Sequence, residues 1–195
     1  MFNRMDSMMF GLVVVISLIL SPIAVAKIEV KENTTYYDVV VAEPENLATV
    51  LKQSTTISRS GNTFYGQTRY SINWTYNANV KKGFCKVGKP RVTAIINTTL
   101  PKLDTQNSAV IEKWDTWFPN LRAHQNQHRQ HAIDTAKQLD KALKKLKRQR
   151  ECSQLFENAT AIADSMIEAS LDKDVQYDEK TRYGYSEGAW SIFEN

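Results

Sequence analysis

The chain has 195 residues, of which 42% are hydrophobic and 24% are charged, and its 25 Lys and Arg against 21 Asp and Glu give a net charge of +4. These proportions exclude a collagen-like chain, a wholly disordered chain and a membrane protein with several spans, and they leave room for about one globular domain. With 4 Trp, 8 Tyr and 7 Phe the chain has enough large side chains to fill a core. One packed domain is therefore expected.

The N-terminal segment has the pattern of a secretory signal peptide. An arginine precedes an apolar run at residues 8–20, and the small residues Ala24 and Ala26 suit signal peptidase. The run is shorter than the roughly 20 residues that a membrane-spanning helix needs. The sequence predicts a signal peptide over residues 1–26 and a secreted or periplasmic domain over residues 27–195, with an uncleaved membrane anchor as the alternative.

Export changes how the two cysteines, Cys85 and Cys152, are interpreted. An oxidising compartment favours a disulfide between them. The bond would close a long loop, which the chain-entropy model values at about 4 kcal/mol. We expect it to tie the two halves of the chain together, and two buried free thiols are the alternative.

The first half of the mature chain has the pattern of β-strands. Apolar and polar side chains alternate over residues 62–77, which is typical of a half-buried strand. Residues 91–100 are again alternating and rich in β-branched side chains, and Pro101 is expected to end this strand because it has no N–H for a ladder. The two segments are predicted to pair as an antiparallel hairpin.

Shorter elements are expected before this hairpin. Residues 28–31 and 36–41 have the composition of short strands. A short helix is predicted over residues 45–53, because it follows Pro44 and carries apolar side chains at helical spacing.

From about residue 108 the hydrophobic period becomes helical, with Val110, Trp114, Trp117 and Leu121 spaced by four, three and four positions. Pro119 lacks a donor and crowds the preceding turn, so it is expected to begin a new helix or kink an existing one.

The main helix is therefore predicted over residues 119–150, after a shorter one. A second long helix is predicted over residues 152–171, and the tail from residue 172 shows no clear period. The fold class is α+β: an N-terminal antiparallel β-sheet with a short helix, followed by two long C-terminal helices. A single domain would comprise a β-rich part (27–104), a helical part (105–171) and an irregular tail (172–195).

All three histidines lie within eight residues, as His124, His128 and His131. On a helix the three rings project from one narrow face. Two histidines four residues apart have the spacing by which one helix gives two imidazoles to zinc, so His124 and His128 are the candidate metal ligands. Histidines that are hydrogen-bonded in the core or at its rim are the alternative.

Further short motifs are spread over most of the mature chain. They are Tyr37-Asp38-Val39, Phe64-Tyr65-Gly66-Gln67-Thr68, Trp74-Thr75-Tyr76, Cys85, Leu100-Pro101, Trp117-Phe118, His124 with His128, Cys152, Tyr177-Asp178, Thr181, Gly184 and Gly188-Ala189. In their order and spacing the chain resembles the bacterial family of predicted secreted zinc-dependent proteases, which is classed as a domain of unknown function. The resemblance implies an exported, zincin-like metallopeptidase domain with an HExxH helix and zinc as cofactor.

Two positions depart from the family's pattern. In HExxH enzymes the glutamate between the histidines takes a proton from the metal-bound water, and here that position is Gln125. An amide has no titratable proton at neutral pH, so Gln125 cannot serve as a general base. Tyr183 stands where the family's pattern has a histidine before the glycine matched by Gly184. If that histidine is a ligand in relatives, this chain has lost it.

Other side chains are candidates for the third ligand. Asp178 or Glu187 can offer a carboxylate oxygen, and Tyr183 can ligate a metal or polarise a carbonyl. His131 can add a nitrogen, although three rings from one straight helix converge on a tetrahedral ion only with difficulty. A distant carboxylate is an alternative base.

A basic run crowds the end of the main predicted helix. Its members are Lys137, Lys141, Lys144, Lys145, Lys147, Arg148 and Arg150. The expected role is a solvated helix face whose cations suit the C-terminal end of the helix dipole. A patch for phospholipid head groups, envelope polyanions or nucleic acid is the alternative, and the lack of interleaved aromatic residues disfavours nucleic acid.

The sequence favours an exported zinc-metallopeptidase-like protein whose hydrolytic activity is weak or lost, because losing a positioned general base typically costs 10²–10⁴-fold in rate. A non-catalytic binding or structural protein of the envelope, on the same fold, is the alternative. A peptide or an envelope protein is the expected partner. Nucleic acid is not expected, and membrane contact is expected only through the signal peptide before cleavage.

Overall fold

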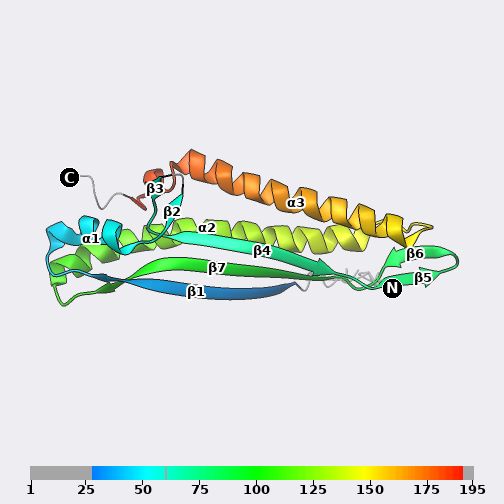
Figure 1. Ribbon diagram of the computed structural model, residues 1–195, viewed down its shortest axis with the longest axis horizontal. Helices are drawn as coiled ribbons and strands as arrows, with labels where there is room; N and C mark the ends of the chain where they lie inside the picture. Colours follow the sequence, from blue (N-terminus) through cyan, green and yellow to red (C-terminus); the bar gives the residue numbers. More distant parts are fainter. Residues whose placement is uncertain (1–27, 60, 191–195) are drawn as a thin grey trace, which may run out of the picture.

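Figure 1 shows the computed structural model, which describes residues 28–59 and 61–190. Three long strands run side by side along the molecule, one long helix lies along them, and a second long helix lies along the first. The α+β fold expected from the sequence is therefore confirmed. The predicted signal peptide, residues 1–26, lies outside the described residues.

The two strongest strand segments of the sequence pair with each other in the main sheet, whose order is β1-β7-β4. Strands β4 (Gln67–Thr75) and β7 (Arg91–Asp104) are antiparallel, as expected, with residue Gln67 opposite Thr99. Their inward side chains form an apolar face, so the alternating pattern found the strands and their pairing correctly.

Strand β1 (Glu29–Val40) joins the other edge of β7 and runs parallel to it, with Glu29 opposite Thr93. The sheet is therefore mixed, and the expectation of an antiparallel sheet is corrected at this strand. Residues 28–31 and 36–41 were predicted as separate strands, but the polar residues between them continue the same ladder. Most of β1 is exposed, so backbone pairing rather than a buried face defines it.

Strand β7 also continues through Pro101, which the sequence predicted as its end. Strand β4 reaches only as far as Thr99 on β7, so beyond that point β7 pairs with β1 alone. A proline is tolerated on an edge where no donor is required.

The segment predicted as one strand over residues 62–77 is divided. Its start, β3 (Asn62–Thr63), pairs with β2 (Ser58–Arg59) in a small hairpin of its own. The chain then crosses to β4 at Gly66, which is buried.

A further hairpin occupies the region predicted as a simple turn. Strands β5 (Ala78–Lys81) and β6 (Phe84–Val87) pair antiparallel. The two residues between them, Lys82 and Gly83, have φ values of +51° and +69°. Two consecutive left-handed residues are what the tightest hairpin turn requires.

The predicted short helix is confirmed. A 3-10 turn, η1 (Pro44–Asn46), leads into α1 (Leu47–Ser54), which packs on β1. The side chains of Leu47 and Leu51 are fully buried, in agreement with the helical spacing of the apolar residues.

Helix α2 (Ser108–Lys145) is a single helix, so the predicted division at Pro119 is wrong. The Asn107 side chain caps the N-terminus of α2, because its Oδ1 accepts hydrogen bonds from the backbone amides of Ala109 and Val110. Pro119 and the residue one turn before it, Asp115, are both exposed, so water can satisfy the carbonyl that loses its donor. Buried side chains on the opposite face hold both sides of the proline to one core.

Helix α3 (Cys152–Thr181) is ten residues longer than predicted, and a short 3-10 turn, η2 (Tyr185–Glu187), follows it. The expectation of an irregular tail from residue 172 is therefore corrected. The missing hydrophobic period has a physical cause, because this end of α3 turns polar side chains inward. Within the described ranges, no helix combines the length and apolar character that crossing a bilayer requires.

The buried apolar residues form two main clusters. One joins α1 to the first part of α2, with Leu47, Leu51 and Trp117 among its members. The other joins the sheet to the second part of α2 and the first part of α3, with Ile96 and Leu139 among its members. The histidine segment of α2 lies between the two clusters.

The disulfide between Cys85 and Cys152 joins β6 to the start of α3, with a Cα–Cα distance of 5.3 Å and a separation of 67 residues. Replacing both cysteines with serine is expected to lower the free energy of unfolding by about 4 kcal/mol, because the unfolded chain regains the freedom of a long loop. Urea unfolding of the oxidised protein and the double variant would measure the difference. A variant as stable as the oxidised protein would contradict this prediction.

Candidate metal centre

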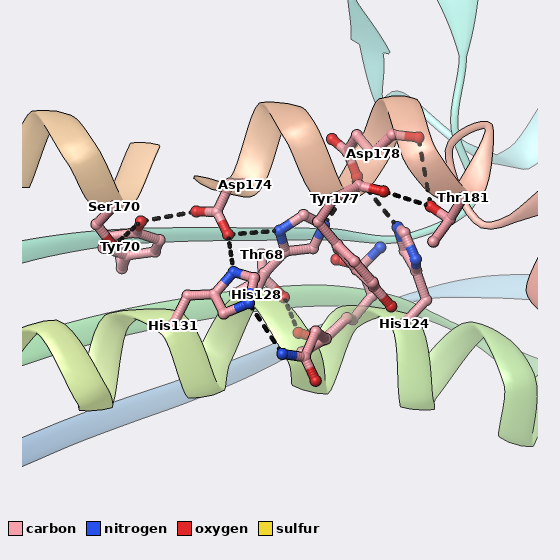
Figure 2. A network of polar contacts seen from close by, with 12 residues as sticks. Thr68, Tyr70, His124, His128, His131, Ser170, Asp174, Tyr177, Asp178 and Thr181 are labelled. Atoms are coloured by element: carbon pink, nitrogen blue, oxygen red, sulfur yellow. Dashed lines mark hydrogen bonds and ion pairs between the residues drawn. The ribbon is translucent and has the colours of Figure 1, made fainter. Parts of the chain in front are cut away.

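Three histidines of α2 face the last part of α3, where two aspartates and a tyrosine meet them (Figure 2). The exposed fractions of His124, His128 and His131 are only 4%, 7% and 3%. The one-face arrangement predicted from their spacing is therefore how they lie. The histidines lie between the two apolar clusters. Because their polar ring nitrogens are buried there, these nitrogens need hydrogen-bond partners.

Asp178 supplies the central partner. Its Oδ1 atom lies 3.3 Å from His124 Nε2 and 3.0 Å from His128 Nε2. The three ligand atoms that these residues offer lie within 4.8 Å of one another, so the residues form a group that could hold a metal ion. Of the candidates for a third ligand, Asp178 is the one that meets both histidines.

The opposite nitrogens of the same two rings are also held by carboxylates. His124 Nδ1 lies 2.8 Å from Glu187 Oε2, and His128 Nδ1 lies 2.9 Å from Asp174 Oδ1. A neutral histidine that donates through Nδ1 directs a lone pair from Nε2. The Nε2 lone pairs of both histidines and the Asp178 carboxylate then point into the same space. These electron-rich groups repel one another unless a cation lies between them, and that cation can be a proton or a metal ion.

Electrostatics in the metal-free protein follow from this arrangement. Burial alone would lower the pKa of His128, but hydrogen bonds to Asp174 and Asp178, and the charges of these groups, outweigh burial and raise the pKa to about 9. Burial would raise the pKa of Asp178, but hydrogen bonds from His124 and His128 hold it well below its usual range. Without a metal ion and below about pH 9, a proton on His128 therefore lies between this ring and the Asp178 carboxylate.

His131 belongs to a neighbouring group rather than to this one. Its Nδ1 lies 2.6 Å from Asp174 Oδ1, and its Nε2 lies 2.9 Å from the side-chain nitrogen of Gln127. Asp174 also accepts a hydrogen bond of 2.7 Å from Tyr70 through its other oxygen. His128, His131 and Asp174 form a second group that could hold an ion, but there Asp174 already orients both rings.

Tyr177 and Glu187 fix the position of His124. The Tyr177 ring stacks on the His124 ring with centroids 5.0 Å apart, and its hydroxyl donates to Glu187 at 2.8 Å. Burial and the hydrogen bond to Glu187 raise the pKa of Tyr177, so it stays a donor. Glu187, a candidate ligand in the sequence, therefore lies on the Nδ1 side of His124 and orients the ring.

The C-terminal turn brings Glu187 to this position. Gly184 has a φ of +89°, and a Cβ there would lie 2.9 Å from Ala189 and 3.2 Å from the His124 ring. Only glycine allows this close approach without strain. Trp117 ties the turn down by donating a hydrogen bond of 2.6 Å to the Ala189 carbonyl.

Tyr183, the other candidate ligand, lies at the rim of the site. Its side chain is 44% exposed, and its ring packs 5.6 Å from Phe64. Both residues line a cleft of about 620 Å³ that opens onto His124 and His128. Tyr183 is thus part of the cleft wall and not of the three-residue ligand group.

Gln125 also lines this cleft. It is 6% exposed, and its side-chain oxygen finds no hydrogen-bond partner among the described residues. A Cβ on Gly66 would lie 3.2 Å from Gln125 Cγ, so the backbone comes close to the side chain there. A buried amide oxygen without a partner is costly, and polar groups left this way in native proteins commonly face a ligand or water.

Asp174 escaped the sequence interpretation, and Tyr177 appeared there only within a family motif, with no role at the site. They share a helical face with Asp178 and Thr181, at spacings of three, four and seven residues. A search for apolar periodicity does not find such a face because every member is polar. The spacing itself was the available signal, and it matches the histidine face of α2.

The site thus combines two histidines and an aspartate, each histidine oriented by a further carboxylate, on an α+β fold. The chain belongs to a family of bacterial proteins of unknown function, DUF922, whose model matches residues 34–184. This match confirms the membership in a domain of unknown function that the sequence motifs indicated. No curated protein and no solved structure matches the chain.

The metal-free protein is expected to lose stability as the pH rises from about 6.5 to about 9. His128 has a folded pKa of about 9 against about 6.5 when unfolded, so its contribution is complete below about 6.5 and disappears through the higher value. The change is of the order of 3 kcal/mol, because each tenfold change in proton concentration is worth about 1.4 kcal/mol. Urea unfolding in EDTA across this range would measure it.

His128→Gln is the control for this pH dependence, because it removes the titrating ring. The variant should show a flatter profile between the two pH limits. An equally steep profile in the variant would assign the dependence to other groups.

Proposed function

We propose that this protein is an exported zinc-metallopeptidase-like protein whose hydrolytic activity is weak or lost. The observation that carries the proposal is the convergence of His124 Nε2, His128 Nε2 and Asp178 Oδ1 beside a cleft. Imidazole nitrogen and carboxylate oxygen are zinc's ligands in sites that keep a position open for substrate. The family resemblance and the disulfide between Cys85 and Cys152, a bond typical of oxidising compartments, support export.

The residues present fit zinc on chemical grounds. Ligand histidines in metalloproteins commonly donate a hydrogen bond from their other ring N–H to a carboxylate, which fixes the ring and its tautomer. Glu187 and Asp174 do this for His124 and His128. When bound, zinc supplies a Lewis acid that polarises a carbonyl and acidifies water.

The local chemistry limits hydrolysis. The Gln125 amide can accept or donate a hydrogen bond in the cleft, but it cannot take a proton from water. The carboxylates nearest to the ligand rings are already used, since Asp178 faces both Nε2 atoms and Asp174 and Glu187 hold the Nδ1 atoms. None of these three is placed as a free base, which supports weak or absent turnover.

A non-catalytic envelope protein that binds a peptide is the second candidate. Aromatic rings in the cleft wall favour it: Phe64 lies 5.6 Å from Tyr183 and 6.0 Å from Trp190. Apolar and aromatic walls with a few polar groups are typical of binding clefts. On this reading zinc, if it binds, would stabilise the fold or the bound peptide rather than activate water.

The test combines metal analysis with a peptidase assay on the zinc-loaded protein. We expect about one zinc ion per chain and hydrolysis about 10²–10⁴-fold below that of an ordinary peptidase. A normal rate that His124→Ala abolishes would overturn the loss of activity. A folded protein that takes up no zinc would favour the peptide-binding reading.

A further inference from the structure

We propose that the end of the molecule opposite α1 binds anionic phospholipid surfaces. This basic tip consists of the β5–β6 hairpin, the start of β7, and the junction between α2 and α3. Its cationic members are Lys81, Lys82, Lys86, Lys89, Arg91, Lys141, Lys144, Lys145, Lys147, Arg148 and Arg150.

The fold joins two basic segments that lie far apart in the sequence (Figure 1). The disulfide between Cys85 and Cys152 links the hairpin to the start of α3, and Cys85 exchanges two backbone hydrogen bonds, of 2.8 and 2.9 Å, with Gln149. The guanidinium groups of Arg148 and Arg150 lie 4.5 and 5.6 Å from the centre of the Phe84 ring. The sequence showed only the helical part of this surface.

The charge on the tip is one-sided. All eleven cationic side chains are exposed, and the carboxylates within the same segments are Asp140, Glu151 and Glu157. Asp140 is buried and bonded to Lys144. Because the whole chain has a net charge of only +4, an excess of eight positive charges at the tip leaves the remainder of the sequence with a net negative charge.

Apolar side chains among these cations favour lipid over nucleic acid. Val80, near the hairpin turn, is 70% exposed, and Phe156, on the second turn of α3, is 59% exposed. Basic residues interspersed with exposed apolar groups suit the boundary between head groups and acyl chains. Nucleic-acid binders instead stack bases on free aromatic faces, and the Phe84 ring is already covered by arginine.

The direction of the chain supports the same partner. Strand β1 enters the described structure at Glu29, opposite Thr93, which is two residues from Arg91 of the tip. The apolar run at residues 8–20 lies only seven residues before position 28, which is at most about 28 Å of extended chain. If this run enters the bilayer during export, the start of β1, beside the basic tip, is the part of the described domain that follows it most closely along the chain.

Such an orientation would hold the cleft away from the lipid. His128 and Lys145 lie on the same helix and are 17 positions apart, which is about 25 Å along the axis. The metal site would then lie about 25 Å along the helix from the lipid-binding tip, rather than at the membrane surface.

The test is co-sedimentation of the full chain, as an exporting host produces it, with two kinds of vesicle. One kind is pure phosphatidylcholine, and the other contains about 30% phosphatidylglycerol. The tip variant carries Lys82→Glu, Lys86→Glu, Lys89→Glu and Lys147→Glu. A matched control with the same change in net charge carries Lys52→Glu, Lys102→Glu, Lys113→Glu and Lys173→Glu, which are exposed positions outside the tip.

We expect phosphatidylglycerol to increase binding at about 0.1 M salt, and high salt to remove the increase. In the tip variant, the binding gained from phosphatidylglycerol should fall at least about tenfold, since each basic residue near an anionic surface contributes about fivefold to binding. The control variant should keep the full gain. The proposal is overturned if phosphatidylglycerol adds no binding or if both variants lose it equally. Tight binding to duplex DNA without a phosphatidylglycerol effect would also overturn it, in favour of nucleic acid.

Discussion

In a zinc titration, His128→Ala and Asp178→Asn are each expected to lower the affinity at least about a hundredfold. His128 Nε2 and Asp178 Oδ1 lie 3.0 Å apart and form two of the three ligand atoms in the group. Losing even an orienting partner costs 10–100-fold in characterised sites, and losing a ligand costs more. Competition with a chelating dye would measure the dissociation constants.

Two further aspartates of α3 serve as controls for this titration. Asp172→Asn should leave the affinity unchanged, because its side chain is exposed. Asp174→Asn should weaken binding by about 10–100-fold, because Asp174 holds the Nδ1 atom of His128 and not the converging lone pairs. If His128→Ala bound zinc as tightly as the unaltered protein, the ion would have to sit elsewhere and the proposed site would be wrong.

The second large effect is expected from Gln125→Glu. A carboxylate at this buried position would supply the missing base, and burial would raise its pKa toward the pH at which general bases work best. We expect peptide hydrolysis by the zinc-loaded variant to rise by about 10²–10⁴-fold. Cleavage of a mixed library of quenched fluorescent peptides would measure the gain.

Gln138→Glu is the matched control, since it makes the same change at an exposed position of α2. It should leave the hydrolysis rate unchanged. Adding His124→Ala to Gln125→Glu should abolish the gain, because the new base would have no activated water. A Gln125→Glu protein that binds zinc and shows no gain would mean that the cleft does not place a peptide for cleavage.

The two long helices show what hydrophobic periodicity predicts in this chain and what it does not. The 3.6-residue spacing identified both long helices, but it placed a boundary at Pro119 that the structure does not have. Local propensity argues for a break there, whereas the apolar face on both sides of the proline belongs to one packed helix. Tertiary packing therefore keeps α2 continuous through Pro119, and a local sequence pattern does not predict that effect.

The sheet shows a different limit. Alternation found β4 and β7 because each buries one face, and it missed the continuity of β1, most of which is exposed. The parallel pairing of β1 with β7 joins residues more than sixty positions apart. Register over such a separation depends on the assembled sheet, so a single sequence does not specify it by pattern.

The site was predictable only in part, for a related reason. The spacing of His124 and His128 predicted a shared face, and the structure places Asp178 against both. Asp174 was missed because α3 was expected to end before it, and a helix that turns carboxylates inward has no apolar stripe to extend the prediction. The polar side chains that form the site are therefore the reason why the C-terminal part of α3, which carries Asp174 and Asp178, was not predicted as helix.

The two halves of α3 are held to the rest of the protein by different forces. Its beginning is fixed by a covalent bond and by small apolar side chains such as Ala159 and Ala163, whereas its end meets α2 through imidazoles and carboxylates. Chelators or alkaline buffer should therefore loosen the C-terminal turns of this helix while its N-terminal turns stay docked. The availability of a suitable ion would then set how firmly the two long helices close on each other.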